Sequence, residues 1–208
     1  RQMCIRDRSG RIDRIGQVST AQIEIEGEGY VLSPGFIDTH AHDDGAFIRH
    51  PGMEFKLLQG VTSVVSGNCG FSAIPSSPDV DHSAASGGIL AGLKGDFVDL
   101  EGYFATVLSK DPSINNMMLV GHNTVRSMVL GDAKRAPTAA ELSTMRDHIR
   151  LALEQGCCGF SSGLIYRPGR YSDTEEVVEL AKVAGEFDAL YTTHMRNEGD
   201  KLLEAVDE

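Results

Sequence analysis

The segment Asp38-Thr39-His40-Ala41-His42 places two histidines two positions apart at the end of an apolar run. Because alternate residues of a β-strand share a face, the two imidazoles would point the same way about 7 Å apart and could bind one metal ion. A bare pair of this kind is equally compatible with two polar residues at a strand terminus. Other ligand-type residues must decide between the two interpretations.

Two such residues follow other apolar runs. Cys69 comes directly after the run in VTSVVSGNCG, and His194 ends the run ALYTTH. A lone buried cysteine is more often a small hydrophobic residue than a ligand. A thiolate among imidazoles nevertheless suits zinc, which accepts nitrogen, sulfur and oxygen donors. If these strand ends meet, His40, His42, Cys69 and His194 form a metal site.

Short apolar runs that alternate with helical patterns would have to position these residues. Five runs are candidate strands, at residues 35–40, 62–66, 117–121, 159–163 and 190–194. The clearest helical pattern covers 138–155, where Thr138 and Glu141 match a capping box and Gly156 ends the helix. A second pattern begins at Ser172 and ends at Gly185.

Repeated strand–helix units build a parallel sheet, either a closed (β/α)8 barrel or an open doubly wound sheet. No glycine-rich nucleotide motif follows the first candidate strand, which favours the barrel. In a barrel the carboxyl ends of all strands face one mouth, where barrel enzymes keep their active sites. The four ligand-type residues would then share that mouth.

Two regions depart from the strand–helix pattern. Residues 9–34 alternate apolar and polar positions between glycines, which predicts small antiparallel strands of a separate β domain. Residues 72–95 are rich in Ser, Gly, Pro and Asp and are too long for an ordinary connection, so we expect an excursion over the barrel mouth.

Composition limits the partners and the compartment. The chain has 208 residues, of which 41% are hydrophobic and 24% charged, as in a globular protein with one sizeable core. A net charge of −11 without a Lys/Arg run argues against nucleic acid and anionic membranes. The basic residues 1–8 are followed by no apolar segment, no run of about 18 apolar residues occurs, and the four cysteines suit reduced thiols or a ligand. We therefore expect a cytoplasmic protein.

Five strings resemble, in order and spacing, the D-aminoacylase branch of the amidohydrolase superfamily: SPGFIDTHAHDD, GVTSVVSGNCGFS, VGHNTVR, GFSSGLIYRPGRY and TTHMRNEGD. The resemblance runs from about Gly10 to the last residue. It implies an α/β chain in which residues 35–208 form a truncated (β/α)8 barrel of about five βα units. Residues 1–34 would begin a small β-sandwich domain.

The resemblance also implies roles for individual residues. His40, His42, Cys69 and His194 would bind zinc, with Cys69 in place of the carboxylated lysine of other amidohydrolases. Cys69 would bridge a tight position shared with His194 and a weak one shared with His40 and His42. Tyr166 would contact the substrate carboxylate. His122, after the third strand, either contacts substrate, orients a neighbouring group or is a polar strand-end residue.

The sequence departs from the family pattern in two places. A further histidine ligand and the aspartate that acts as general acid and base are expected beyond Glu208, so we assign no catalytic residue and expect a fragment. RQMCIRDR replaces an apolar first strand, so we hypothesise that residues 1–8 are not native.

The fourth strand contains no lysine, which disfavours the carboxylated-lysine subtype.

The expected activity is metal-dependent hydrolysis of a small N-acyl-D-amino acid to a carboxylate and a free D-amino acid. One alternative is another amidohydrolase, such as an amidase, a deaminase or a dipeptidase. The other is an inactive truncated piece of such an enzyme. The acyl group, the amino acid, the number of metals and the oligomeric state stay open at this stage.

Overall fold

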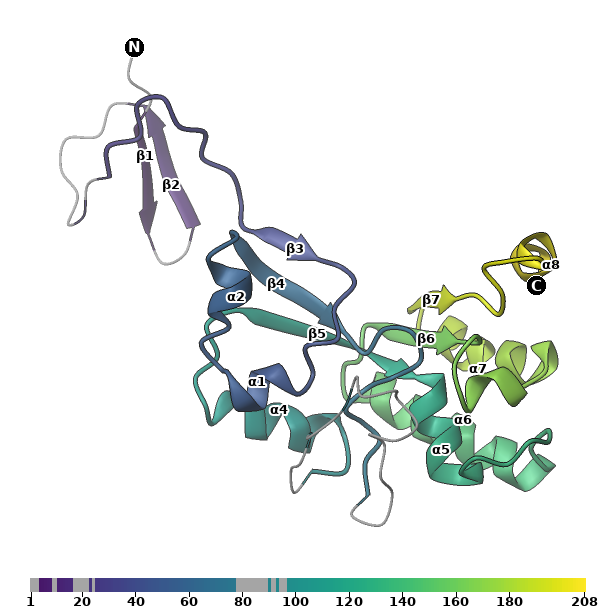
Figure 1. Cartoon of the computed structure of the whole chain (residues 1–208). Helices are drawn as coiled ribbons and strands as arrows, with labels where there is room; N and C mark the ends of the chain where they lie inside the picture. The colour runs from purple at the N-terminus through teal and green to yellow at the C-terminus, as the bar shows by residue number, and fades with distance from the viewer. Residues whose placement is uncertain are drawn as a thin grey trace. The chain divides into compact units, whose positions relative to one another are not determined.

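A computed structural model describes residues 4–8, 11–16, 23, 25–77, 90, 93 and 97–208 (Figure 1). The chain divides into two compact units, Arg1–Pro34 and Gly35–Glu208. Most of the excursion expected at 72–95 lies outside the described residues. Its described start, residues 72–75, is buried.

The first unit contains a two-stranded antiparallel hairpin. Strand β1 (Cys4–Arg8) pairs with β2 (Arg11–Gly16), and the register shifts between Arg6 and Asp7. β1 therefore lies within the octapeptide that we hypothesised to be non-native. The described residues from 25 to 34 form no strand.

The second unit is built on a sheet of five parallel strands. They are β3 (Phe36–Asp38), β4 (Val61–Ser66), β5 (Asn115–Gly121), β6 (Gly159–Gly163) and β7 (Leu190–His194). Each strand pairs with the next one in the chain, in the order β3-β4-β5-β6-β7. This arrangement is that of consecutive units of a (β/α)8 barrel, and it confirms the predicted fold class.

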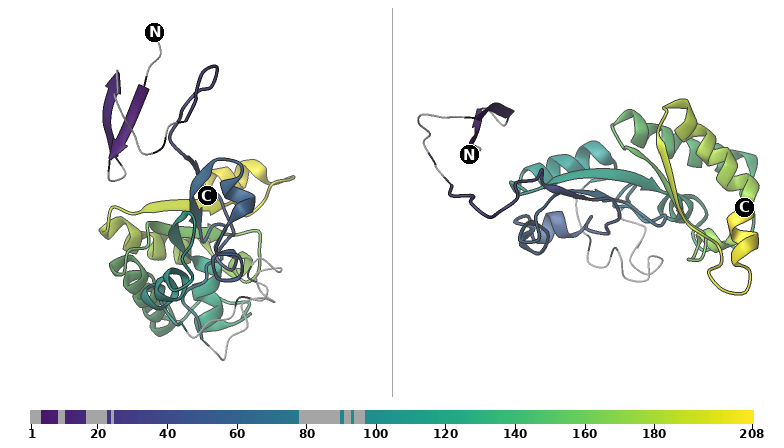
Figure 2. Two further views of the ribbon diagram at one scale, coloured as in Figure 1. Left: turned by 90° about the vertical axis from the view of Figure 1, so that its left-hand side faces the viewer. Right: turned by 90° about the horizontal axis from the view of Figure 1, so that it is seen from above.

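Helices connect the strands, and α4 to α7 lie along one side of the curved sheet (Figures 1 and 2). No helix in the described part of the chain has the length and apolarity needed to cross a bilayer. The elements are α1 (Ala46–Arg49), α2 (Glu54–Leu57), α4 (Leu100–Leu108), α5 (His122–Leu130), α6 (Ala139–Glu154), the 3-10 turn η1 (Gly169–Tyr171), α7 (Thr174–Glu186) and α8 (Leu202–Asp207).

Capping residues set the ends of the two predicted helices. Thr138 and Glu141 form the expected capping box of α6, and Gly156 follows the helix with a φ of 109°. The prediction of Ser172 as the capping residue of α7 is wrong by one position, and the helix itself begins at Thr174. Asp173 is the cap, because its carboxylate accepts from the backbone N–H of Glu176 at 2.9 Å, whereas the Ser172 hydroxyl donates to Gly169.

The hydrophobic core lies between the sheet and these helices. Its members are buried aliphatic and aromatic side chains from both layers, and burying each contributes about 1.5–3 kcal/mol. They include Val64, Leu100, Tyr103, Met118, Val120, Met145, Ile149, Phe160, Leu180 and Val183. The core therefore fixes the strands, and with them the loops at their carboxyl ends.

A buried charged group joins α5 to α7. The Glu176 carboxylate accepts from His122 Nε2 at 2.8 Å and from Arg126 Nη1, and both partners are fully buried. Arg126 Nη2 donates to the carbonyl oxygens of Ala133 and Arg135 at 3.2 and 2.7 Å. Burial alone would raise the pKa of Glu176, but the hydrogen bonds from His122 and Arg126 hold it below its ordinary value.

Removing the Glu176 carboxylate should therefore destabilise the second unit strongly. Glu176→Ala leaves Arg126 buried without its anion, and we expect a loss of about 3–5 kcal/mol in the free energy of unfolding. Glu175→Ala changes an exposed residue of the same helical turn and should cost at most about 0.5 kcal/mol. Urea unfolding followed by circular dichroism measures both, and equal losses in the two variants would contradict the assignment.

Candidate metal centre

Three predicted ligands meet at the carboxyl ends of β3 and β4. One ligand atom from each of His40, His42 and Cys69 lies within 4.8 Å of the others. His40 Nε2 is 3.2 Å from Cys69 Sγ, and the two imidazole centroids are 5.5 Å apart. Strand β3 ends at Asp38, so both histidines lie in the loop after the strand and not on the strand itself.

The fourth predicted ligand approaches the same thiol from β7. His194 Nδ1 is 3.6 Å from Cys69 Sγ and 3.3 Å from the hydroxyl of Tyr166. His194 Nε2 lies 3.0 Å from Glu198 Oε1 but is not aligned to form a hydrogen bond. The structure thus brings the Cys69 thiol between His40 and His194, with Tyr166 beside it.

Two of these distances match those between ligands that share a zinc ion, although the ligand atoms that lie within 4.8 Å of one another are those of His40, His42 and Cys69 and do not include His194. Nitrogen and sulfur ligands bound at about 2.0–2.3 Å to one tetrahedral ion lie roughly 3.3–3.6 Å from each other. The His40–Cys69 and Cys69–His194 separations of 3.2 and 3.6 Å are close to that range. His42 Nδ1 is buried and has no hydrogen-bond partner within the described ranges. Its lone pair is therefore available to bind a metal.

Burial shifts the pKa values of two of these groups. It raises the pKa of the Cys69 thiol, and the Glu198 carboxylate raises it further. Burial also lowers the pKa of the His42 imidazole, and nearby His40 adds to this effect. The imidazole is therefore kept neutral with a free electron pair, while binding of a cation to the thiol would have to displace a proton.

The Cys69 loop has an unusual backbone that its neighbours hold in place. Cys69 has a φ of 54°, in the left-handed region, and so do Gly67 at 78° and Gly70 at 79°. Ser161 on β6 donates to the Gly67 carbonyl at 2.5 Å and accepts from the Gly70 N–H at 3.0 Å. The backbone N–H of Thr124 in the first turn of α5 donates to the Gly70 carbonyl at 3.1 Å.

Gly163, the last residue of β6, lets that strand approach the Cys69 loop. A Cβ at this position would overlap the carbonyl oxygen of Cys69. The next residue, Leu164, donates its backbone N–H to the His194 carbonyl at 2.9 Å. Glycine at position 163 therefore allows β6 to pack against the Cys69 carbonyl, and the neighbouring Leu164 links this contact to the end of β7.

Lys56, near the cluster, has no role that the sequence predicts. Lys56 Nζ lies 2.6 Å from Asp38 Oδ2 and 3.0 Å from Asp43 Oδ2, so it ties α2 to the loop that carries the histidines. Asp38 Oδ1 also accepts from the His40 backbone N–H at 3.1 Å. Lys56 is 18 positions from Asp38, and no sequence motif marks that pairing.

The structure places His122 apart from the cluster, in the buried group with Glu176 and Arg126 described above. Its side chain has no exposed surface. Its Nε2 atom is hydrogen-bonded to the Glu176 carboxylate at 2.8 Å.

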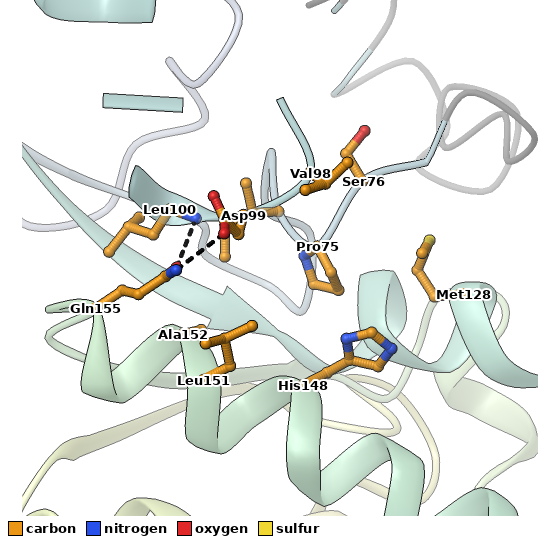
Figure 3. Close-up of a pocket in the computed structure, with 11 residues that line it drawn as sticks. Pro75, Ser76, Val98, Asp99, Leu100, Met128, His148, Leu151, Ala152 and Gln155 are labelled. Carbon is orange, nitrogen blue, oxygen red and sulfur yellow. Dashed lines mark hydrogen bonds between the residues drawn. The ribbon is translucent and has the colours of Figure 1, made fainter. Parts of the chain in front are cut away.

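A small apolar cavity lies elsewhere, between α4, α5 and α6 (Figure 3). It measures about 160 Å³, and Met128, His148 and Leu151 contribute to its wall. Gln155 crosses one end, where it accepts from the Leu100 N–H at 3.0 Å and donates to Asp99 at 2.9 Å. None of the four predicted ligands lines this cavity, so it is separate from the metal centre.

Comparison with known proteins agrees with this geometry. The chain is 43% identical over 206 residues to an N-acyl-D-glutamate deacylase and 36% identical over 203 residues to a D-aminoacylase, both from Alcaligenes xylosoxydans xylosoxydans. These matches cover 97% of the chain but only 41% and 42% of the two relatives. The chain therefore spans about two fifths of their length.

A solved structure is similar over the whole chain. It is the N-acyl-D-glutamate deacylase from Bordetella bronchiseptica complexed with zinc and a phosphonate inhibitor that mimics the tetrahedral intermediate of the reaction. The TM-score is 0.91 at 41% sequence identity, over 100% of this chain and 44% of that one. No family model matches the sequence.

The close approach at Gly163 gives a test of how the site is assembled. Gly163→Ala should push β6 away from the Cys69 carbonyl, which costs about 1–3 kcal/mol of stability and weakens zinc binding. Gly185→Ala is the matched control, because a Cβ there meets no atom within 4 Å. Zinc titration by calorimetry should show weaker binding only for Gly163→Ala; unchanged binding in that variant would refute the contact's importance.

Proposed function

We propose that this chain, which belongs to the D-aminoacylase branch of the amidohydrolase superfamily, carries a zinc centre of an enzyme that hydrolyses N-acyl-D-amino acids. The position of the Cys69 thiol between His40 and His194 carries this proposal. The similarity to deacylases that act on N-acyl-D-amino acids supports the substrate class. We assign this activity to the whole enzyme, of which this chain would supply about two fifths.

His40, His42, Cys69 and His194 would hold the metal. The thiol is near His40 and His194, and the family resemblance implies that it would be shared by two metal positions, a tight one with His194 and a weaker one with His40 and His42. When bound, zinc activates water for attack on the amide carbonyl and polarises that carbonyl. Hydrolysis would break the C–N bond, placing the hydroxyl of the attacking water on the acyl carbon and the remaining water proton on the leaving nitrogen.

The residues around the cluster would orient the substrate and the ligands. Tyr166 presents its hydroxyl beside His194 and is half-buried, so we assign it the contact with the substrate carboxylate. Lys56 holds Asp38 and Asp43, and these contacts fix the backbone from which His40 and His42 extend. We propose that His122 supports α5 and α7 and does not contact substrate.

Two broader assignments accompany the proposal. We infer that residues 1–34 are part of a small β domain distinct from the barrel unit, on the strength of the β1–β2 hairpin. We also infer a reducing, cytoplasmic location, because Cys69, Cys157 and Cys158 are free thiols and a thiol ligand must stay reduced.

Zinc content tests the ligand assignment. Cys69→Ala removes the thiol that lies 3.2 Å from His40 Nε2 and 3.6 Å from His194 Nδ1, so the affinity for zinc should fall at least about tenfold. Cys158→Ala removes a free thiol that is partly exposed and should leave zinc content unchanged. Mass spectrometry of metal content after dialysis measures both. Equal zinc content in wild type and Cys69→Ala would overturn the assignment.

Substrate hydrolysis tests the proposed reaction. The whole zinc-loaded enzyme that contains this chain should release free amino acid from N-acetyl-D-glutamate or N-acetyl-D-methionine and much less from the L-enantiomers. Tyr166→Phe keeps the ring but removes the hydroxyl, and we expect a rise in KM of about tenfold with little change in kcat. Release of ammonia from an amino-substituted substrate, without deacylation, would instead favour a deaminase of the same superfamily.

A further inference from the structure

Asp44 contacts both flanks of the Cys69 loop. Its side chain is completely buried. Oδ1 accepts a hydrogen bond from the Ala73 backbone N–H at 2.9 Å, and Oδ2 accepts a longer one from the Gly67 N–H at 3.4 Å. One carboxylate therefore connects the residue at the start of the loop with a residue just past its end.

The core holds Asp44 itself in place. The hydroxyl of Tyr103, on α4, donates to the Asp44 backbone carbonyl at 2.9 Å, and Tyr103 is also fully buried. Tyr103 in turn accepts from the amide of Asn116 on β5 at 3.3 Å. The carboxylate thus extends from a fixed point toward the Cys69 loop.

The position of Asp44 in the chain makes it a link between two sets of ligands. It follows His42 by two residues, and it contacts the loop that carries Cys69. The segment that supplies two imidazoles therefore also holds the segment that supplies the thiol. Because the Cys69 backbone is left-handed, it needs such external restraints to keep its conformation.

A carboxylate is the chemical group that this position requires. Two oxygens can accept from two separate N–H groups at once, whereas a hydroxyl or a thiol offers one accepting atom. A buried carboxylate is costly unless hydrogen bonds compensate for lost hydration. Here the backbone N–H groups of Gly67 and Ala73 supply those hydrogen bonds. The carboxylate therefore serves to hold the backbone in place and not to pair with a cation.

We propose that Asp44 is a positioning residue that fixes the Cys69 thiol between His40 and His194. The inference rests on the proposed function, because Cys69 is taken there as a zinc ligand. It extends that function by assigning to Asp44 the geometry of the thiol, with no contact to metal or substrate. Loss of the carboxylate should release the Cys69 loop locally while the core stays folded.

The first experiment measures thiol accessibility in metal-free protein. Alkylation by iodoacetamide is followed by peptide mass spectrometry, and buried Cys157 serves as an internal reference. In Asp44→Ala we expect the Cys69 rate to rise about tenfold or more relative to Cys157, since two hydrogen bonds to a charged group are lost. The exposed Asp132→Ala should leave that ratio unchanged.

Asp44→Asn keeps the side-chain shape and an oxygen that can accept from the Ala73 N–H. It should therefore give a smaller rise in the Cys69 alkylation rate, and it should remain folded even if Asp44→Ala does not. A parallel rise at Cys69 and Cys157 in both Asp44 variants would indicate general destabilisation and overturn the proposal. Unchanged Cys69 reactivity in both variants would overturn it as well.

The second experiment uses cobalt(II) alone as the probe. Each Asp44 variant should bind Co²⁺ about 10–100-fold more weakly, with less thiolate-to-cobalt charge-transfer absorption per bound ion. Undiminished charge transfer per bound ion would show that the thiol keeps its place without Asp44. If the wild-type protein binds Co²⁺ without any charge-transfer band, the ligand role of Cys69 fails, and the alkylation ratios still decide whether Asp44 holds the loop.

Discussion

The backbone at Cys69 is the constraint on which the site depends. A left-handed conformation at a residue other than glycine costs about 1–3 kcal/mol and persists only where the surroundings enforce it. Here those surroundings are hydrogen bonds from β6, α5 and the loop after β3, together with the glycines at 67 and 70. Together they turn the thiol away from the path of β4 and into the space between His40 and His194.

The sheet determines which residues can contribute to that space. Because β3, β4 and β7 run parallel, their carboxyl ends lie at one edge of the sheet, and residues separated by up to 125 positions meet there. The hydrophobic core and the buried Glu176 group keep α5 and α7 against β6. The site thus depends on a strained backbone at Cys69, and the packed strands and helices hold that backbone in place.

Much of this arrangement follows from sequence patterns with local causes. The strands appear as apolar runs, the capping box of α6 as Thr138 and Glu141, and the ligand set as histidines and a cysteine at strand ends. The start of α7 was misplaced because Ser172 and Asp173 are both good capping residues, and only the structure shows which side chain reaches the helix. The roles of Lys56 and Glu176 depend on contacts 18 and 50–54 positions apart, which no local pattern encodes.

X-ray absorption at the zinc edge of the zinc-loaded protein distinguishes a thiol-centred site from one made of histidines, because it counts the atoms around the metal by element and distance. We expect one sulfur at about 2.3 Å and nitrogen or oxygen atoms at about 2.0–2.1 Å. The sulfur contribution should vanish in Cys69→Ala. A zinc shell of nitrogen and oxygen alone in the wild-type protein would contradict a thiol-centred site and leave the histidines as the whole of the metal centre.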